Sequence, residues 1–147
     1  MTNNISFSIG ADNNSRCVSI AKEYLAKNKY SIFEYGTSVG DDLDWVEIAK
    51  KVSKDVQEHK SSFGILFCYT GTGVTMVANK FKGIRAALCN DEDVAAGARK
   101  WNDANILAMG TMTVKEDQIE SILAAWIDTK VDRLELKNIK KIDEIEL

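Results

Sequence analysis

The segment from Phe63 to Lys80 constrains the fold more than any other part of the chain. It opens with an apolar run without a polar break, which is typical of a strand buried on both faces of a parallel sheet. Cys68 stands where that strand should end, and Gly71 and Gly73 allow a sharp turn with the backbone open to a ligand. A helix is predicted from Val74. The amides of the turn and the start of this helix are therefore suited to holding an anion.

The two common nucleotide-binding glycine loops do not match this segment. A Walker A loop requires Gly-Lys-Ser/Thr after four intervening residues, and the segment lacks that sequence. A dinucleotide fingerprint requires a third glycine where Met76 stands, and it follows the first strand, whereas this loop follows the third. What remains is a thiol that faces a loop of backbone N–H groups, a geometry that can stabilise an enediolate or another small oxyanion.

Composition indicates one globular domain over residues 1–147, without an extended basic surface for nucleic acid. The net charge is -3, and no apolar run approaches the roughly 20 residues that span a membrane. Three cysteines in unrelated contexts, Cys17, Cys68 and Cys89, suggest free thiols and a cytoplasmic protein. The one histidine, His59, lies in a polar stretch and is expected to be solvated. Cys17 and Cys89 are expected in the core.

Strand-like and helix-like segments alternate along the chain. This alternation predicts right-handed βαβ crossovers and a parallel sheet of about five strands. The expected strands are 5–9, 31–35, 63–67, 84–88 and 106–109; the expected helices are 16–27, about 44–58, one from 74, 91–101, about 115–128 and about 134–145. Ligands in such sheets bind beyond the carboxyl ends of the strands, which places Asp12, Asn13, residues 68–74 and residues 90–92 along one rim. The last helix has a spare apolar stripe and is expected to pack on a second subunit.

Several short motifs occur in an order that resembles a known family. They are Gly10-Ala-Asp12, Tyr35-Gly-Thr37, Gly64-Ile-Leu-x-Cys-x-Thr-Gly-x-Gly73, Ala78-Asn-Lys80, Gly83-Ile-Arg-Ala-Ala-Leu88, Asn102-Asp-Ala-Asn105 and Ala124-Ala-Trp126. Together they resemble the ribose-5-phosphate isomerase B family, which includes the galactose-6-phosphate isomerase subunits. The resemblance covers nearly the whole chain. It implies a three-layer Rossmann-like α/β domain that forms a homodimer or homotetramer, with sites built between two subunits.

The resemblance also implies an activity and a set of site residues. The reaction is a metal-free and cofactor-free aldose–ketose isomerisation of a sugar phosphate, such as ribose 5-phosphate to ribulose 5-phosphate, through an enediolate. Cys68 is the expected base, with Thr70 as the second catalytic residue. The residues expected at the substrate are Asp12, Asn13, Trp45, the loop residues Gly71, Thr72, Gly73, Val74 and Thr75, and Trp101, Asn102, Arg133 and Lys137.

The sequence departs from the family pattern at several working positions. Asn13 and Trp101 stand where the family has histidines, and Trp101 replaces the histidine that opens a cyclic sugar. The family's Asp-Tyr-Pro motif becomes Asp44-Trp45-Val46, the glycine after the cysteine becomes Tyr69, and an arginine after the fifth strand becomes Met112. The C-terminal phosphate-binding segment has no clear counterpart, and Arg133, Lys137, Lys140 and Lys141 are the nearest cations. The proton-transfer half of the site is thus retained, and the ring-opening and phosphate-binding halves are altered.

Three explanations of these departures remain open from the sequence. The enzyme acts on a substrate that is already open, it is one subunit of a hetero-oligomer, or it has lost catalysis and binds sugar phosphates only. Simpler structural roles also remain: Cys68 as a small buried hydrophobe, Asp12 as a helix cap, and Trp101 as a packing residue. The sequence therefore predicts a sugar-phosphate isomerase with Cys68 as its base, and no nucleic-acid or membrane partner.

Overall fold

The computed structural model describes residues 4–145, so the predicted domain over 1–147 extends past these limits at both ends. Five parallel strands form one sheet in the order β2-β1-β3-β5-β4. Their bounds are β1 Ser6–Ala11, β2 Ser31–Gly36, β3 Phe63–Cys68, β4 Ala86–Leu88 and β5 Ile106–Gly110. The helices are α1 Arg16–Lys27, α2 Trp45–Gln57, α3 Thr72–Ala78, α4 Glu92–Asn102, α5 Ile119–Asp128 and α6 Leu136–Glu144, with short 3-10 helices at 37–39, 116–118 and 133–135.

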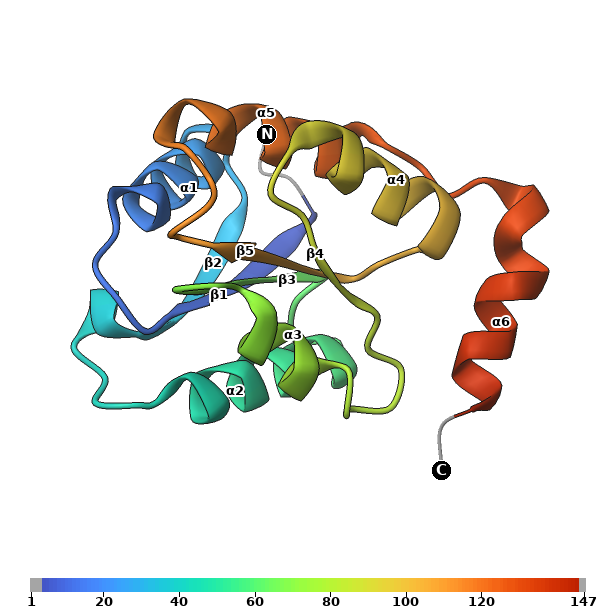
Figure 1. Cartoon of the computed structure of the whole chain (residues 1–147), viewed down its shortest axis with the longest axis horizontal. Coiled ribbons are helices and arrows are strands. Elements are labelled where there is room, and N and C mark those ends of the chain that lie inside the picture. Colours follow the sequence, from blue (N-terminus) through green and yellow to red (C-terminus); the bar gives the residue numbers. More distant parts are fainter. Residues whose placement is uncertain (1–3, 146–147) are drawn as a thin grey trace.

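The helices cover both faces of the sheet and give the three layers seen in Figure 1. α1, α4 and α5 pack on one face around Phe7, Phe67 and the fully buried Trp126. α2 and α3 pack on the other face around Ile48 and Leu66. The inner strands are buried almost throughout, as expected for parallel strands covered on both sides. The structure confirms the predicted α/β class and the five-stranded parallel sheet.

Side-chain caps start three of the helices at the positions that their sequences favour. Ser15 accepts a hydrogen bond from the amide of Cys17, Asp44 from Glu47 and Asp91 from Val94. These bonds satisfy backbone N–H groups that have no partner within the helix. They also fix the points at which the chain turns from a strand end into the next helix.

Several elements differ from the prediction at their ends, β4 and α3 among them. The fourth strand begins at Ala86 rather than residue 84, because the amide of Ile84 donates to the carbonyl of Phe81 at 3.1 Å. The side chain of Asn79 exchanges hydrogen bonds of 2.8 and 2.9 Å with the backbone of Ala86 at the start of the strand. Arg85, just before it, donates its amide to the side chain of Asn105 at 2.8 Å. α3 begins at Thr72 rather than 74 and ends at Ala78, so Lys80 lies beyond it.

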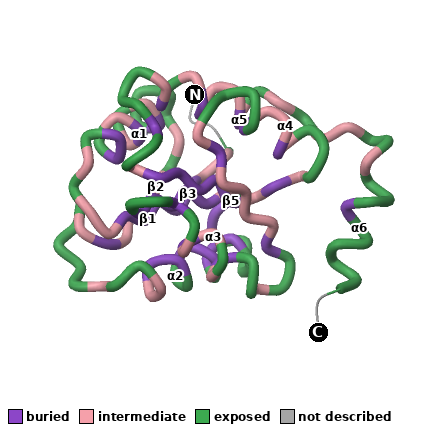
Figure 2. Tube along the Cα trace, in the orientation of Figure 1, coloured by how far each residue is buried: buried purple, intermediate pink, exposed green. Residues whose placement is uncertain are grey.

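α6 stands apart from the three layers at one side of the molecule (Figure 1). Ile139 is its one buried residue in the described range, and most of α6 is exposed in Figure 2. Leu134, Leu136, Ile142 and Ile145 form an exposed apolar stripe along this segment. No helix of residues 4–145 is long and apolar enough to cross a membrane.

Candidate active site

A cavity of about 300 Å³ opens at the carboxyl ends of β1 and β3. It is lined by Asp12, Trp45, Cys68, Tyr69, Thr70, Thr72 and Gly73. Six of these were predicted site residues, and Tyr69 had been noted only as a departure from the family pattern. The parallel sheet brings them together because each follows or begins an element at the same edge.

Cys68 is the last residue of β3, and only 6% of it is exposed. Its Sγ accepts a hydrogen bond of 3.1 Å from the amide of Gly71. The carbonyl of Cys68 accepts the amide of Thr111 at 3.0 Å, which fixes the end of β3 against the end of β5. The thiol is therefore held in one place, with a backbone N–H directed at its sulfur.

Gly71 makes the tight turn after Cys68. Its φ is +78°, and a Cβ there would lie 2.5 Å from Leu88 and 2.8 Å from the amide nitrogen of Gly110. Both the backbone conformation and the close approach of β5 require glycine. α3 begins directly afterwards, so the amides of its first turn have no acceptor within the helix.

Two threonine hydroxyls face each other in the loop. Thr70 Oγ1 and Thr72 Oγ1 are 2.7 Å apart, and either can donate to the other. Thr75, in α3, donates its hydroxyl to the carbonyl of Gly71 at 2.6 Å. The side chain of Val74 is fully buried in the core, so only the amide of Val74 could contact a ligand.

Trp45, the first residue of α2, forms one wall of the cavity. Its ring lies against the backbone of Gly73, where a Cβ would come within 2.8 Å of the ring. The cap at Asp44 sets the start of α2 and thereby the place of Trp45. The combination of a glycine and a tryptophan narrows this side of the cavity.

Asp12 lines the cavity, whereas Asn13 braces the turn beside it. Asn13 Nδ2 donates to Asp12 Oδ1 at 3.0 Å and to Thr111 Oγ1 at 3.4 Å, and Asn13 Oδ1 accepts the amide of Ser15 at 3.1 Å. Sequence reasoning did not single out Thr111. The sequence feature that could have identified Thr111 is its position directly after β5, the strand that pairs with β3 beside Cys68.

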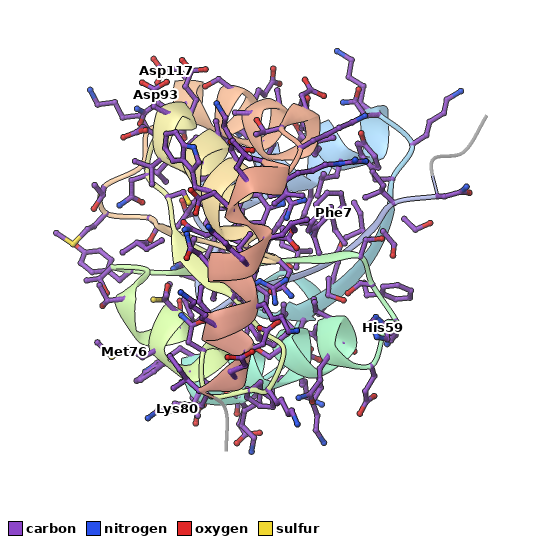
Figure 3. All side chains as sticks on the ribbon, turned by 90° about the vertical axis from the view of Figure 1, so that its right-hand side faces the viewer. Phe7, His59, Met76, Lys80, Asp93 and Asp117 are labelled. Carbon is purple, nitrogen blue, oxygen red and sulfur yellow. The ribbon has the colours of Figure 1, made fainter. Side chains whose placement is uncertain are left out.

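Four predicted site residues lie elsewhere in the chain. Trp101, 52% exposed, and Asn102 end α4, and the chain then enters the amino end of β5, at the opposite edge of the sheet from Cys68. Asn102 lines a different cavity with Ile142 and Ile145 of the α6 segment. Arg133 and Lys137 belong to the C-terminal segment, residues 132–145, which contains α6. Figure 3 looks onto that segment, with Lys80, another residue lining this second cavity, beside the lower end of α6.

The electrostatics of the Cys68 cavity are simple. Among the residues described, its lining has one carboxylate, Asp12, and no lysine, arginine or histidine. His59 lies at a polar turn before β3, at the other edge of the sheet. Burial, and secondarily the charge of Asp91, raises the pKa of the Cys89 thiol to about 12, so Cys89 is an inert core thiol. No group of three or more His, Cys, Asp or Glu side chains within residues 4–145 could hold a metal ion.

Known proteins resemble this chain over most of its length. Residues 7–145 match the Ribose/Galactose Isomerase family. A D-erythrulose-4-phosphate isomerase of Pectobacterium atrosepticum is 32% identical over 132 residues, covering 87% of this chain and 86% of that protein.

Solved structures agree with this match. Ribose-5-phosphate isomerase B of Clostridium thermocellum superposes with a TM-score of 0.89 at 31% identity, over 96% of this chain and 97% of that one. The enzyme of Mycoplasma genitalium, solved with bound ribulose-5-phosphate, gives a TM-score of 0.89 at 28% identity, over 97% of this chain and 96% of that one.

Proposed function

This chain belongs to the ribose/galactose isomerase family and is a sugar-phosphate isomerase, and we propose that Cys68 is the base of its aldose–ketose reaction. The observation that carries the proposal is the 3.1 Å hydrogen bond from the Gly71 amide to Cys68 Sγ in the cavity at the end of β3. Cys68 held there lies beside the amides at the start of α3, which have no acceptor within the helix.

The proton transfers follow from these groups. Cys68 takes the proton from C2 of the aldose, the C1 carbonyl becomes an enediolate oxygen, and the amides of residues 71–75 hold the negative charge. The Thr70 hydroxyl, paired with Thr72 at 2.7 Å, gives a proton to O1 and accepts one from the hydroxyl at C2. Cys68 returns its proton to C1, which leaves the ketose. Asp12 accepts a hydrogen bond from a sugar hydroxyl at the cavity wall.

The substrate is an acyclic sugar phosphate, and a four-carbon aldose 4-phosphate fits best. A tetrose whose terminal oxygen carries phosphate cannot close a furanose ring, so it needs no acid–base residue for ring opening. The absence of histidine from the described cavity lining supports this class. So does the 32% identity to an enzyme named for D-erythrulose 4-phosphate.

A second copy of the chain completes the site. The Cys68 cavity has no cation of its own in the described lining, although a phosphate dianion requires one. Trp101, Asn102, Arg133 and Lys137 lie outside it and can reach a Cys68 cavity only from another subunit. A homodimer is the simplest such assembly, and a homotetramer built from such dimers would serve equally.

The test is deuterium exchange at C2 of a panel of sugar phosphates with four to six carbons, for the wild type and Cys68→Ala. We expect exchange with the tetrose phosphate and a loss of about 10²- to 10⁴-fold in Cys68→Ala. Ribose 5-phosphate should react more slowly, because most of it is cyclic.

Cys17→Ala is the matched control. Cys17 is also a buried cysteine, but its Sγ lies near the carbonyl of Val114 at 3.8 Å and does not line the Cys68 cavity. Its removal should leave exchange near the wild-type rate. Full exchange in a folded Cys68→Ala protein would remove Cys68 as the base, and equal rates with cyclic pentose and acyclic tetrose phosphates would remove the substrate assignment.

A further inference from the structure

The C-terminal segment is tied at both of its ends to the last residues of α4. At its start, the amide of Asp132 donates to the carbonyl of Lys100 at 2.8 Å. At its end, Arg85 Nη1 contacts Asp143 Oδ1 at 3.2 Å, while Nε of the same guanidinium donates to the carbonyl of Asp103 at 2.9 Å. The two anchor points, Lys100 in α4 and Asp103 directly after it, enclose Trp101 and Asn102.

Arg85 is built into this junction rather than resting on the surface. Its side chain is only 16% exposed, and Nη2 also contacts Asp103 Oδ2 at 3.3 Å. The other carboxylate oxygen of Asp103 is paired with Arg99 Nη1 at 2.9 Å. Asp103 has a φ of +47°, an unusual conformation that these two arginines hold in place.

Few other interactions in the described range hold α6 against the body of the molecule. Ile139 is its only buried residue there, and Figure 1 shows α6 at one side of the three layers. The orientation of α6 relative to Trp101 and Asn102 therefore depends strongly on the contacts of Arg85 and Asp132. A guanidinium with several donors in a fixed plane is suited to joining two carboxylates and a carbonyl in one geometry.

We propose that Arg85 is a positioning residue that aligns the end of α4 and α6 as one unit for the active site of the second subunit. The inference rests on the two-subunit site proposed above, because only there do Trp101, Arg133 and Lys137 act beside a Cys68. Arg85 itself touches no substrate. It sets the distance between the indole of Trp101 and the cations of the C-terminal segment.

The test uses heterodimers in which each subunit carries a different tag and a different substitution. Arg85→Gln should lower the activity of the homodimer by about 10-fold, mainly through a higher KM, because charged hydrogen bonds of this kind are worth that much. A heterodimer of Arg85→Gln with Cys68→Ala has one site with an intact Cys68 and an intact α4–α6 unit. It should recover about half of the wild-type activity.

The control heterodimer joins Thr70→Ala with Cys68→Ala. Both residues line the same cavity, so no intact site forms and activity should stay at half of the Thr70→Ala homodimer or below. A purely structural role of Arg85 would leave its defect uncorrected by the Cys68→Ala partner. Recovery thus separates positioning across the interface from a local loss of stability.

Asp143→Asn provides a second variant if Arg85→Gln does not fold. Its carboxylate is 45% exposed, and only its link to Arg85 would be lost, so we expect about a threefold loss and the same recovery with Cys68→Ala. Wild-type activity in both variants, failure of both to recover, or an active monomer would overturn the inference. Activity that persists in the Cys68→Ala homodimer would instead overturn the proposed base, because that homodimer keeps Arg85 intact.

Discussion

At the scale of single residues, Gly71 is the position where both the backbone conformation and the lack of space for a Cβ require glycine. Gly71→Ala introduces a side chain at a φ of +78° and places its Cβ 2.5 Å from Leu88 and 2.8 Å from the Gly110 amide nitrogen. We expect the free energy of unfolding to fall by about 2–4 kcal/mol, from backbone strain and overpacking together. Isomerase activity should be lost as well, because the loop that holds the Cys68 thiol must move. Urea unfolding and the exchange assay measure the two effects.

Gly40→Ala is the matched control for this prediction. Gly40 has a φ of +75°, but a Cβ there would meet nothing within 4 Å. Its substitution should lower the free energy of unfolding by about 1 kcal/mol, from backbone strain alone, and leave activity unchanged. Equal losses of stability in the two variants would show that crowding against β5 plays no part at Gly71.

The buried Cys89 thiol is expected to make the protein less stable at alkaline pH. Burial raises the pKa of its thiol from 9.0 to about 12, so the folded protein retains this proton where the unfolded chain has lost it. The contribution of Cys89 to the free energy of unfolding is complete below pH 9. It declines as the pH rises from about 9 to 12, by an amount on the order of 4 kcal/mol.

Urea unfolding between pH 8 and 11.5 checks this dependence. Cys89→Ala should show a shallower decline, though some slope should remain because burial also raises the pKa of Tyr24 and Tyr35. The same decline in the variant and the wild type would assign the alkaline loss to other groups.

At the scale of secondary-structure elements, the cap of α2 links helix stability to the cavity. Asp44 accepts the amide of Glu47 at 2.8 Å, and the next residue, Trp45, forms a cavity wall. Asp44→Ala should lower the free energy of unfolding by about 1 kcal/mol, which corresponds to a fall in Tm of about 2–4 °C. It should also raise KM, because Trp45 is then less firmly held.

Asp91→Ala is the comparison variant, because Asp91 caps α4 by the same kind of bond to Val94, also at 2.8 Å. Asp91 lies outside the lining of the Cys68 cavity, so its loss should lower Tm by a similar amount with little change in KM. Thermal melts and steady-state kinetics on both variants make the comparison. A similar rise in KM for both would show that general loosening, rather than Trp45, affects binding.

The order of the elements could be predicted from the sequence because apolar runs and amphipathic faces alternate clearly. The exact ends could not, where side chains replace backbone partners. The side chain of Asn105 takes the amide of Arg85 and the carbonyl of Phe81 takes the amide of Ile84, so Ile84 and Arg85 lie outside β4 despite their β-favouring neighbourhood. Such side-chain bonds depend on the folded position of a residue far along the chain, which periodicity does not report.

At the scale of the whole molecule, the parallel sheet explains why only part of the predicted site comes together in one chain. Asp12, Trp45 and Cys68 lie near strand ends of the same direction, so the topology alone places them at one edge. Trp101 ends a helix that runs back to the opposite edge. In the two-subunit site proposed above its role would depend on a second copy, and a single sequence does not specify how two copies meet.

The apolar stripe of the α6 segment gives the last prediction. Leu134 is 80% exposed, and with Ile142 and Ile145 it would leave a large apolar surface in water if the chain were monomeric. We expect light scattering at micromolar concentration to give a dimer or tetramer. Leu134→Asp should shift the protein to monomers and reduce activity by about 100-fold, because the groups of the second subunit would no longer be held near Cys68.

Val39→Asp is the matched control, since Val39 is also an exposed aliphatic residue, 46% accessible, but lies in the 3-10 helix at 37–39 after β2. The substitution adds the same charge and should leave both the mass of the oligomer and the activity unchanged. Activity that falls in parallel with the dimer fraction of Leu134→Asp on dilution would tie catalysis to the interface. A wild-type protein that is monomeric and fully active would show instead that one chain contains the whole site, and the missing cation would then have to come from the rim of the Cys68 cavity itself.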